Sequence, residues 1–308
     1  MFRLVRRCGP LLASLFILSS CLTWPQKDRS APKQLILSAE LKPGLNPASL
    51  HDGQKLLLYL PSYPLSTQSN PKILVIIHGF LKINNIEQGL SSVHQRLTPW
   101  IPFARRSNFI LLAPLFDSTR FRNDFQRLNM KGPRADLRLN DIIIMIKELI
   151  PEIKAHKINL FGFSGGGQFV HRYVAFHPDM VQAAVAAAAG WYLWPDPDLP
   201  YPLGLKISKF NKLEKPRLKD MMSAPLLILV GENDRTQSSF RTIYHSYNLN
   251  QLQGESRFER ALNWFQAMRN ASTEQNFSIQ LHVVPQTEHN ISPQMLNMAR
   301  NFITEHNK

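Results

Sequence analysis

The chain has 308 residues, of which 44% are hydrophobic, and its formal net charge is +14. This is enough apolar material for one large core, and the lack of an internal period excludes a repeat architecture. The charge favours anionic surfaces such as acidic lipids. The basic residues are scattered without helix-turn-helix or zinc-finger spacing, and their dense run at 206–219 is typical of a solvated face, so no nucleic-acid partner is expected.

The N-terminus has the features of an export signal. A basic start precedes an apolar stretch over 11–18 that is too short to cross a bilayer as a permanent helix. The stretch ends in LSSC at Cys21, which resembles the lipobox of bacterial lipoproteins, whose cysteine receives a diacylglyceryl group and becomes the new N-terminus. We predict a signal peptide over 1–21, a polar tether over 22–33, and a protein held by Cys21 in the bacterial cell envelope, on the periplasmic side or the outer membrane. The alternative is an ordinary cleavable signal that happens to end in cysteine.

The cysteine content narrows the chemistry. The only two cysteines are Cys8, inside the predicted signal, and Cys21, at its end. The mature chain would therefore have no thiol for a disulfide, a zinc site or a catalytic cysteine.

From Gln34 onward, short apolar runs alternate with longer segments of helical period. Several of the runs are continuously apolar, which is typical of strands buried on both faces of a parallel sheet. We predict strands over 34–39, 55–61, 72–79, 108–114, 157–163, 183–190, 225–231 and 278–285. The run at 183–190 is rich in alanine, so a helix is the alternative there.

The segments between the runs predict helices over 139–150, over 257–271, and from Ser292-Pro293 toward the C-terminus. Alternating strands and helices predict a three-layer α/β domain over 34–308, with a mostly parallel sheet of about eight strands flanked by helices. Residues 191–222 interrupt the alternation with prolines and aromatics, and we interpret them as a lid or pocket insertion.

Residues 161–169 read FGFSGGGQF and contain the pattern G-x-S-x-G around Ser164. The pattern by itself arises by chance in about one chain in ten of this length. Here a predicted strand precedes it and a helical segment follows it, as a nucleophile elbow requires. We therefore predict that Ser164 is a nucleophile, that Gly162 and Gly166 relieve crowding at the turn, and that Gly167 allows close packing.

The partners of such a serine occur in the required order along the chain. Asp234 follows the glycine that closes the predicted strand 225–231, and Glu232 is the alternative acid. His289 follows the last predicted strand and precedes the last predicted helix. This placement predicts a triad of Ser164, Asp234 and His289.

Two backbone amides are expected to bind the oxyanion of such a site. One is the N–H of Gly165, directly after the nucleophile, and the other is the N–H of Phe80, after the predicted strand 72–79. We interpret His78 as a structural hydrogen-bonding residue beneath that turn. His171 and His177 are expected to point away from the serine. No histidine has a partner at metal-ligand spacing, so neither a metal nor another cofactor is expected.

These pieces together resemble the α/β-hydrolase superfamily from about Gln34 to the C-terminus, and the matching parts are His78-Gly79-Phe80, the turn around Ser164, Gly231 to Asp234, and His289. The stretch GFSGGGQFVHRYVAFHPDMVQAAVAAAAGWY resembles secreted esterases and polyhydroxybutyrate-depolymerase-like enzymes, although neither disulfides nor an appended polymer-binding domain are expected in this chain. The resemblance implies hydrolysis of carboxylic esters, on a small or oligomeric substrate, through an acyl-enzyme.

Three alternatives to an esterase stay open. The same triad serves serine peptidases and acyltransferases, and a non-catalytic envelope protein could use the fold for binding. Aromatic residues of the insertion are expected either to line the substrate pocket or to pack the loop, namely Trp191, Tyr192 and Trp194.

Overall fold

A computed structural model describes residues 35–62, 70–81, 85–128, 132–208, 213–236, 243–244, 247–272 and 276–308. The predicted signal peptide, the tether and Cys21 therefore lie outside the described residues. Residues Pro32–Lys308 form one compact unit. Among the described residues, no helix combines the length and the apolar character needed to cross a membrane.

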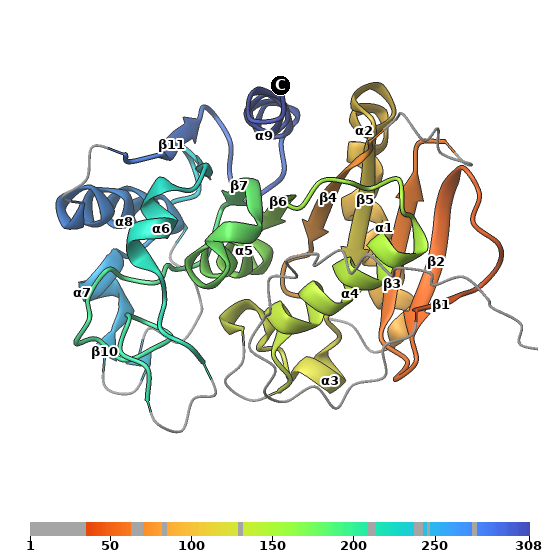
Figure 1. The fold of residues 1–308 in the computed structure, drawn as a ribbon. Coiled ribbons are helices and arrows are strands. Elements are labelled where there is room, and N and C mark those ends of the chain that lie inside the picture. Colours follow the sequence, from red (N-terminus) through yellow and green to blue (C-terminus); the bar gives the residue numbers. More distant parts are fainter. Residues whose placement is uncertain are drawn as a thin grey trace, which may run out of the picture. The chain divides into compact units, whose positions relative to one another are not determined.

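The centre of the fold is a nine-stranded sheet with the strand order β1-β2-β3-β5-β4-β6-β7-β8-β11 (Figure 1). The first three neighbouring pairs are antiparallel, and every pair from β5 to β11 is parallel. The mostly parallel sheet is thus confirmed, with nine strands in place of about eight. The strands are β1 (Leu35–Leu37), β2 (Gly44–Leu50), β3 (Lys55–Leu60), β4 (Lys72–Ile77), β5 (Phe109–Pro114), β6 (Ile158–Phe163), β7 (Val181–Ala187), β8 (Leu226–Gly231) and β11 (Ile279–Val284).

Each predicted run forms a strand, and the alanine-rich run is a strand too. β7 pairs in parallel with β6 and β8, so the helical alternative for 183–190 is wrong. The additional strand of this nine-stranded sheet is β2, whose sequence GLNPASL is only weakly apolar and contains Pro47. Proline usually argues against a strand because it cannot donate to the ladder. Here the Pro47 carbonyl still accepts a hydrogen bond, from the Ser38 N–H at 3.3 Å.

Helices cover both faces of the sheet. α1 (Ile86–Leu97), α2 (Ile101–Ser107) and α9 (Pro293–Glu305) share one hydrophobic cluster with the strands, while α4 (Ala135–Leu149), α5 (Gly165–Phe176), α6 (Leu218–Ser223) and α8 (Arg257–Ala271) share the other. Leu56, Leu58 and Leu60 of β3 join one cluster, and Leu57 and Tyr59 join the opposite one. Both faces of the inner strands β3 to β8 are therefore buried, which explains their continuous apolar runs, whereas the edge strands β1 and β11 are partly exposed.

The three helices predicted from the sequence, α4, α8 and α9, lie near their expected positions. α8 spans the predicted 257–271 and begins with a capping box between Ser256 and Glu259. α9 follows the Ser292 cap and buries the stripe that its sequence suggests, Met295, Leu296, Ala299, Phe302 and Ile303. α4 begins at Ala135, four residues before the predicted start, and its first turn contains Asp136, which is buried and paired with Arg134.

Short elements complete the described part of the chain. They are α3 (Ser118–Phe121), α7 (Leu249–Gln253), the pair β9 (Ile243–Tyr244) and β10 (Tyr247–Asn248), and 3₁₀ turns at Thr98–Trp100, Phe125–Arg127 and Pro178–Met180. Most of them lie in loops that connect the sheet with the helices.

Candidate active site

Ser164 occupies the corner between β6 and α5. Its backbone angles are φ 57° and ψ −114°, and a serine adopts this sparsely populated conformation with positive φ only when its surroundings impose it. The N–H of Ser164 donates to the Ala187 carbonyl at the end of β7, 2.8 Å away, and its own carbonyl accepts from the Gln168 N–H in the first turn of α5. This strained turn between strand and helix is the geometry of a nucleophile elbow.

The glycines around Ser164 are required by close contacts between backbones. A Cβ on Gly162 would lie 2.2 Å from the Gly166 carbonyl oxygen, and a Cβ on Gly166 would lie 2.2 Å from the Ile77 oxygen. Real Cβ atoms do not approach an oxygen so closely. A Cβ on Gly167 would lie 2.7 Å from the Ala187 oxygen, so this glycine lets α5 approach the end of β7.

Ser164, His289 and Asp234 form a continuous chain of hydrogen bonds. The Nδ1 of His289 lies 2.8 Å from an Asp234 carboxylate oxygen, and its Nε2 lies 3.1 Å from the Ser164 hydroxyl oxygen. Because a carboxylate only accepts, Nδ1 carries the proton and Nε2 is left to accept the serine proton. Asp234 is 1% exposed, so its charge acts in a site with little water.

The structure brings Asp234, and not the alternative acid Glu232, to the histidine. Glu232 is exposed, and its carboxylate accepts the Gln286 N–H at 3.0 Å. The two loops that carry Asp234 and His289 are pinned together, since the Asn233 N–H donates to the Thr287 carbonyl at 2.9 Å.

One contact of the acid was not foreseen from the sequence. Arg257, the first residue of α8, donates from Nη1 to the second carboxylate oxygen of Asp234 at 3.1 Å. In the sequence, Arg257 is recognisable only as the residue after the helix cap Ser256. That position does not indicate which group its side chain contacts.

The two amides expected to bind an oxyanion lie next to each other. A Cβ on Gly165 would lie 3.1 Å from the Phe80 nitrogen, and a Cβ on Gly79 would lie 3.4 Å from the Ser164 Cβ. Within the described ranges, no backbone hydrogen bond uses the N–H of Phe80 or Gly165. The two N–H groups thus lie beside the serine, as the prediction of an oxyanion site requires.

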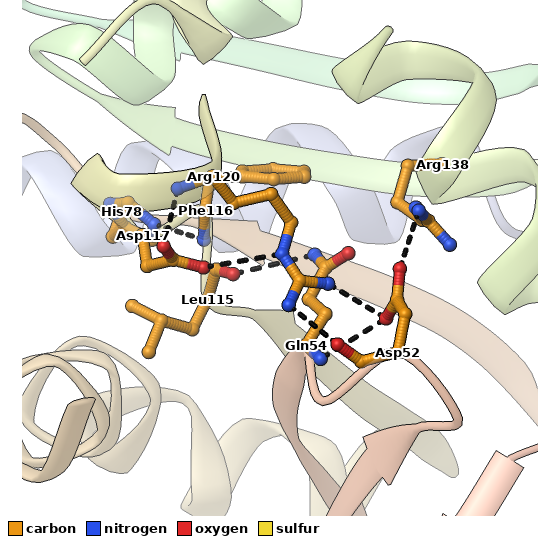
Figure 2. A network of polar contacts seen from close by, with 8 residues as sticks. All are labelled: Asp52, Gln54, His78, Leu115, Phe116, Asp117, Arg120 and Arg138. Carbon is orange, nitrogen blue, oxygen red and sulfur yellow. Dashed lines mark hydrogen bonds and ion pairs between the residues drawn. The ribbon is translucent and has the colours of Figure 1, made fainter. Parts of the chain in front are cut away.

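His78 orients one of these two amides. Its Nδ1–H donates to the Gly79 carbonyl at 2.7 Å. Its Nε2 accepts the Phe116 N–H at 2.9 Å, a contact that Figure 2 includes. Burial lowers the pKa of His78 to about 4, so the ring is neutral and can fill both roles. The Gly79 carbonyl and the Phe80 N–H belong to one trans peptide and point in opposite directions. Holding the carbonyl therefore directs the Phe80 N–H.

The loop that supplies Phe116 is itself fixed to the turn between β2 and β3 (Figure 2). The Asp117 carboxylate accepts the Arg120 N–H at 2.8 Å, and the Arg120 guanidinium forms an ion pair with Asp52 at 2.7 Å. Arg138 of α4 forms a second ion pair with Asp52, also at 2.7 Å, and the Gln54 side chain donates to the Leu115 carbonyl. These contacts support the peptide that His78 orients.

The other histidines near the site have structural partners. His171 is fully buried, its Nδ1 donates to the Gly167 carbonyl at 3.0 Å and its Nε2 accepts the Leu193 N–H at 2.9 Å. His177 pairs with Asp136 of α4 at 2.7 Å. In the described part of the chain, no three histidine, cysteine or acidic side chains are grouped so that they could hold a metal ion.

The insertion residues proposed for the pocket are largely buried. Tyr192 has no exposed surface and stacks on Trp264, with ring centroids 5.0 Å apart. Trp191 is 9% exposed and lies beneath the Arg172 guanidinium, while Trp194 packs partly buried against the core. Their burial favours the packing alternative, and substrate contact by them stays a prediction.

The architecture matches solved structures of hydrolases, although no family model matches the chain and no curated protein is similar to it in sequence. Poly(aspartic acid) hydrolase-1 from Sphingomonas sp. KT-1 is 24% identical, with a TM-score of 0.68 over 86% of this chain and 100% of that one. The poly(3-hydroxybutyrate) depolymerase from Bordetella parapertussis is 24% identical, with a TM-score of 0.64 over 85% and 89%. The chain has the α/β-hydrolase fold.

A fluorophosphonate-binding serine hydrolase from Staphylococcus aureus has the same fold with less similarity. It is 13% identical, and its TM-score is 0.53 over 89% of this chain and 99% of that one. Within the α/β-hydrolase fold, Ser164 lies at the carboxyl end of a central strand, where such folds place their sites.

Proposed function

We propose that this protein is a serine hydrolase that cleaves carboxylic esters through Ser164, His289 and Asp234. The observation that carries the proposal is the hydrogen-bonded chain from the buried carboxylate through the imidazole to a serine held at positive φ. The named activities of the structural neighbours, which are a depolymerase and two hydrolases, support it.

The first half of the reaction forms an acyl-enzyme. The Ser164 oxygen attacks the ester carbonyl carbon while Nε2 of His289 takes the hydroxyl proton. The Phe80 and Gly165 amides bind the oxygen that becomes negative, and losing one such donor costs about 3 kcal/mol in the transition state. His289 then gives its proton to the leaving alkoxide oxygen as the carbon–oxygen bond breaks, which releases the alcohol.

The second half releases the acid. Water attacks the acyl carbon and gives one proton to Nε2 of His289, and the tetrahedral intermediate collapses as that proton returns to the Ser164 oxygen. Asp234 stays ionised throughout and stabilises the imidazolium that forms in each half. No proton or charge is left over, so the site returns to its starting state without a cofactor.

A fluorophosphonate probe tests the nucleophile directly. We expect the purified protein to be labelled at Ser164, and Ser164→Ala to abolish the labelling. Ser223→Ala is a matched control, because this serine is exposed on α6 and bonds only locally, to the Lys219 carbonyl. Absence of labelling in the folded wild-type protein would contradict the proposal and favour the non-catalytic envelope protein.

The bond that is cleaved is tested with matched substrates. We expect p-nitrophenyl esters of some acyl length to be hydrolysed, and aminoacyl anilides to be hydrolysed far more slowly. A peptidase-like activity is the second candidate, because one neighbour is a poly(aspartic acid) hydrolase and the net charge of +14 would favour an anionic substrate. Activity on anilides or poly(aspartic acid) without activity on esters would replace the first proposal by the second.

For the location, we propose export and a lipid anchor on Cys21, which would place the hydrolase at a bacterial membrane with its basic surface near anionic lipids. Support comes from the basic start, the short apolar stretch and the LSSC sequence. Mass spectrometry of the mature N-terminus tests it. A mature chain whose first residue carries no acyl chains would refute the anchor, and Cys21→Ala is expected to leave the signal uncleaved or the product soluble.

A further inference from the structure

We propose that Arg257 is a positioning residue of the active site, which acts on the reaction through Asp234. The inference rests on the proposed function. The two oxygens of the Asp234 carboxylate have separate partners: one accepts from His289 at 2.8 Å, and the other accepts from Arg257 at 3.1 Å. The acid of the triad therefore lies between the imidazole and a guanidinium.

The fold places Arg257 there by the way α8 begins. Ser256 caps the helix with a capping box, so Arg257 is its first residue and its orientation is defined. The N–H of Phe258, the next residue, donates to the Asp234 backbone carbonyl at 3.2 Å. The first turn of α8 thus holds both the main chain and the side chain of the acid, and α8 packs against the neighbouring strand β8 and the edge strand β11.

Burial explains why the acid needs this second partner. Asp234 is 1% exposed and Arg257 is 9% exposed, so neither charge is hydrated as it would be at the surface. A buried carboxylate is costly unless charged or polar groups satisfy both of its oxygens. Arg257 satisfies the oxygen that His289 does not use, and it fixes the carboxylate rotamer so that the other oxygen points at Nδ1 of His289.

Arg257 also changes the field at the histidine. Its positive charge offsets part of the Asp234 charge, so the imidazolium formed during the reaction is held less tightly and gives its proton more readily to the leaving group. Without this charge, the imidazolium formed during the reaction would be held more tightly by the Asp234 carboxylate. A shift of the pH–rate profile to higher pH on removal of Arg257 would indicate a positioning role, because the loss of a purely structural contact would not move the profile.

Other titratable groups surround Asp234 and His289, and they are unchanged in the variants described below. Burial raises the pKa of the Tyr192 phenol, and the charge of Asp234 raises it further. The Arg96 guanidinium lies 5.8 Å from the centroid of the Phe163 ring, and that ring stacks on His289. Three exposed charged residues lie close in sequence to Asp234 or His289, namely Glu232, Arg235 and Glu288.

Arg257→Met, Arg257→Lys and Arg260→Met test the proposal by kcat, KM and pH–rate profiles on a p-nitrophenyl ester. Arg260 is the matched control, because it is buried on the same helix but donates to the Gly190 and Gly254 carbonyls. We expect Arg257→Met to lower kcat by about tenfold to a hundredfold, as loss of an orienting partner does, with little change in KM. The acid limb of its profile should move to higher pH, on the order of one unit.

The two other variants define the controls. Arg257→Lys keeps the charge, so its acid limb should stay at the wild-type pH while kcat falls by a smaller factor. Arg260→Met should lower the melting temperature without moving the limb. If Arg257→Met does not fold, the neutral variant Arg257→Gln replaces it. The pH at which the acid limb of its pH–rate profile lies is then the deciding measurement.

A double-mutant cycle with Asp234→Asn asks whether Arg257 acts through the acid. In that background, replacing Arg257 should change kcat by less than about threefold, because the carboxylate it positions is gone. The same loss in both backgrounds, or an Arg257→Met enzyme that matches Arg260→Met in kcat and acid limb, would overturn the inference. A wild-type protein that neither reacts with fluorophosphonate nor cleaves esters would instead refute the proposed function.

Discussion

Replacing His78 tests whether a buried neutral imidazole supports the oxyanion turn. In the folded protein its ring donates to the Gly79 carbonyl and accepts from the Phe116 N–H, and burial lowers its pKa from 6.5 to about 4. His78→Asn places an amide nitrogen near the position of Nδ1, and His78→Gln places an amide oxygen near the position of Nε2. Each variant therefore keeps one of the two hydrogen bonds and removes the titration.

The size of the pH effect follows from the pKa of His78. Above pH 6.5 the ring is neutral in the folded and in the unfolded chain, so its contribution to stability is constant. As the pH falls from 6.5 toward about 4, the unfolded chain binds a proton that the folded protein does not, and the free energy of unfolding decreases. The difference between the two pKa values corresponds to about 3 kcal/mol, at about 1.4 kcal/mol per unit.

Urea unfolding at several pH values between 4 and 7 measures this effect. We expect the wild-type protein to lose about 3 kcal/mol more than either variant over this range, because the variants lack the group that titrates. The variants should be less stable at pH 7, since each leaves one buried polar group without its partner at a cost of about 1–3 kcal/mol. A difference between wild type and variants that is independent of pH would refute the neutral, buried state of His78.

Ester hydrolysis by the same two variants tests the link to the oxyanion. His78→Asn keeps the donor to the Gly79 carbonyl, so the Phe80 amide stays oriented and kcat should fall by less than about tenfold. His78→Gln lacks that donor, and kcat should fall by about a hundredfold, the loss typical of one oxyanion donor. The reverse order of the two variants would show that the Phe116 contact matters more than the Gly79 contact.

Three further predictions follow from the site. Asp234→Asn should lower kcat by about 10⁴-fold, as the same change does in a serine protease triad, while Glu232→Gln should leave kcat within about threefold; an equal loss in the two would reassign the acid. Gly162→Ala should prevent folding to a labelled state, because the new Cβ would lie 2.2 Å from the Gly166 oxygen, and normal fluorophosphonate labelling of this variant would contradict the close packing of the turn. Ser256→Ala should cost about 1 kcal/mol in urea unfolding through loss of the α8 cap, and an unchanged midpoint would contradict the capping box.

The sheet shows which structural features could be read from local patterns. The apolar runs predicted eight of the nine strands of the central sheet, and the inner ones among them, β3 to β8, are buried on both faces. β2 was missed because its residues are weakly apolar and include Pro47, and its strand conformation depends on pairing with β1 and β3. Pairing partners are a property of the folded chain, and a short sequence window does not contain them.

The candidate active site likewise combines features that are local in the sequence with contacts that are not. Ser164, Asp234 and His289 were predicted from their order and from the strands before them, since the end of a strand is a local feature of the chain. Their contacts join residues 125 and 55 positions apart, and the contact of Arg257 with Asp234 joins residues 23 positions apart. Which acid faces the histidine, and which cation faces the acid, depended on how loops pack at one edge of the sheet.

The hydrophobic period, the turn glycines and the order of the reactive side chains are local features of the chain. They were sufficient to predict the fold class, and they also led to the proposal of Ser164 as the nucleophile. The neutrality of His78 and the partner of Arg257 were not accessible in this way. Both arise from burial and from distances between segments remote in sequence, because the removal of water and the approach of specific charges occur only when those segments pack together.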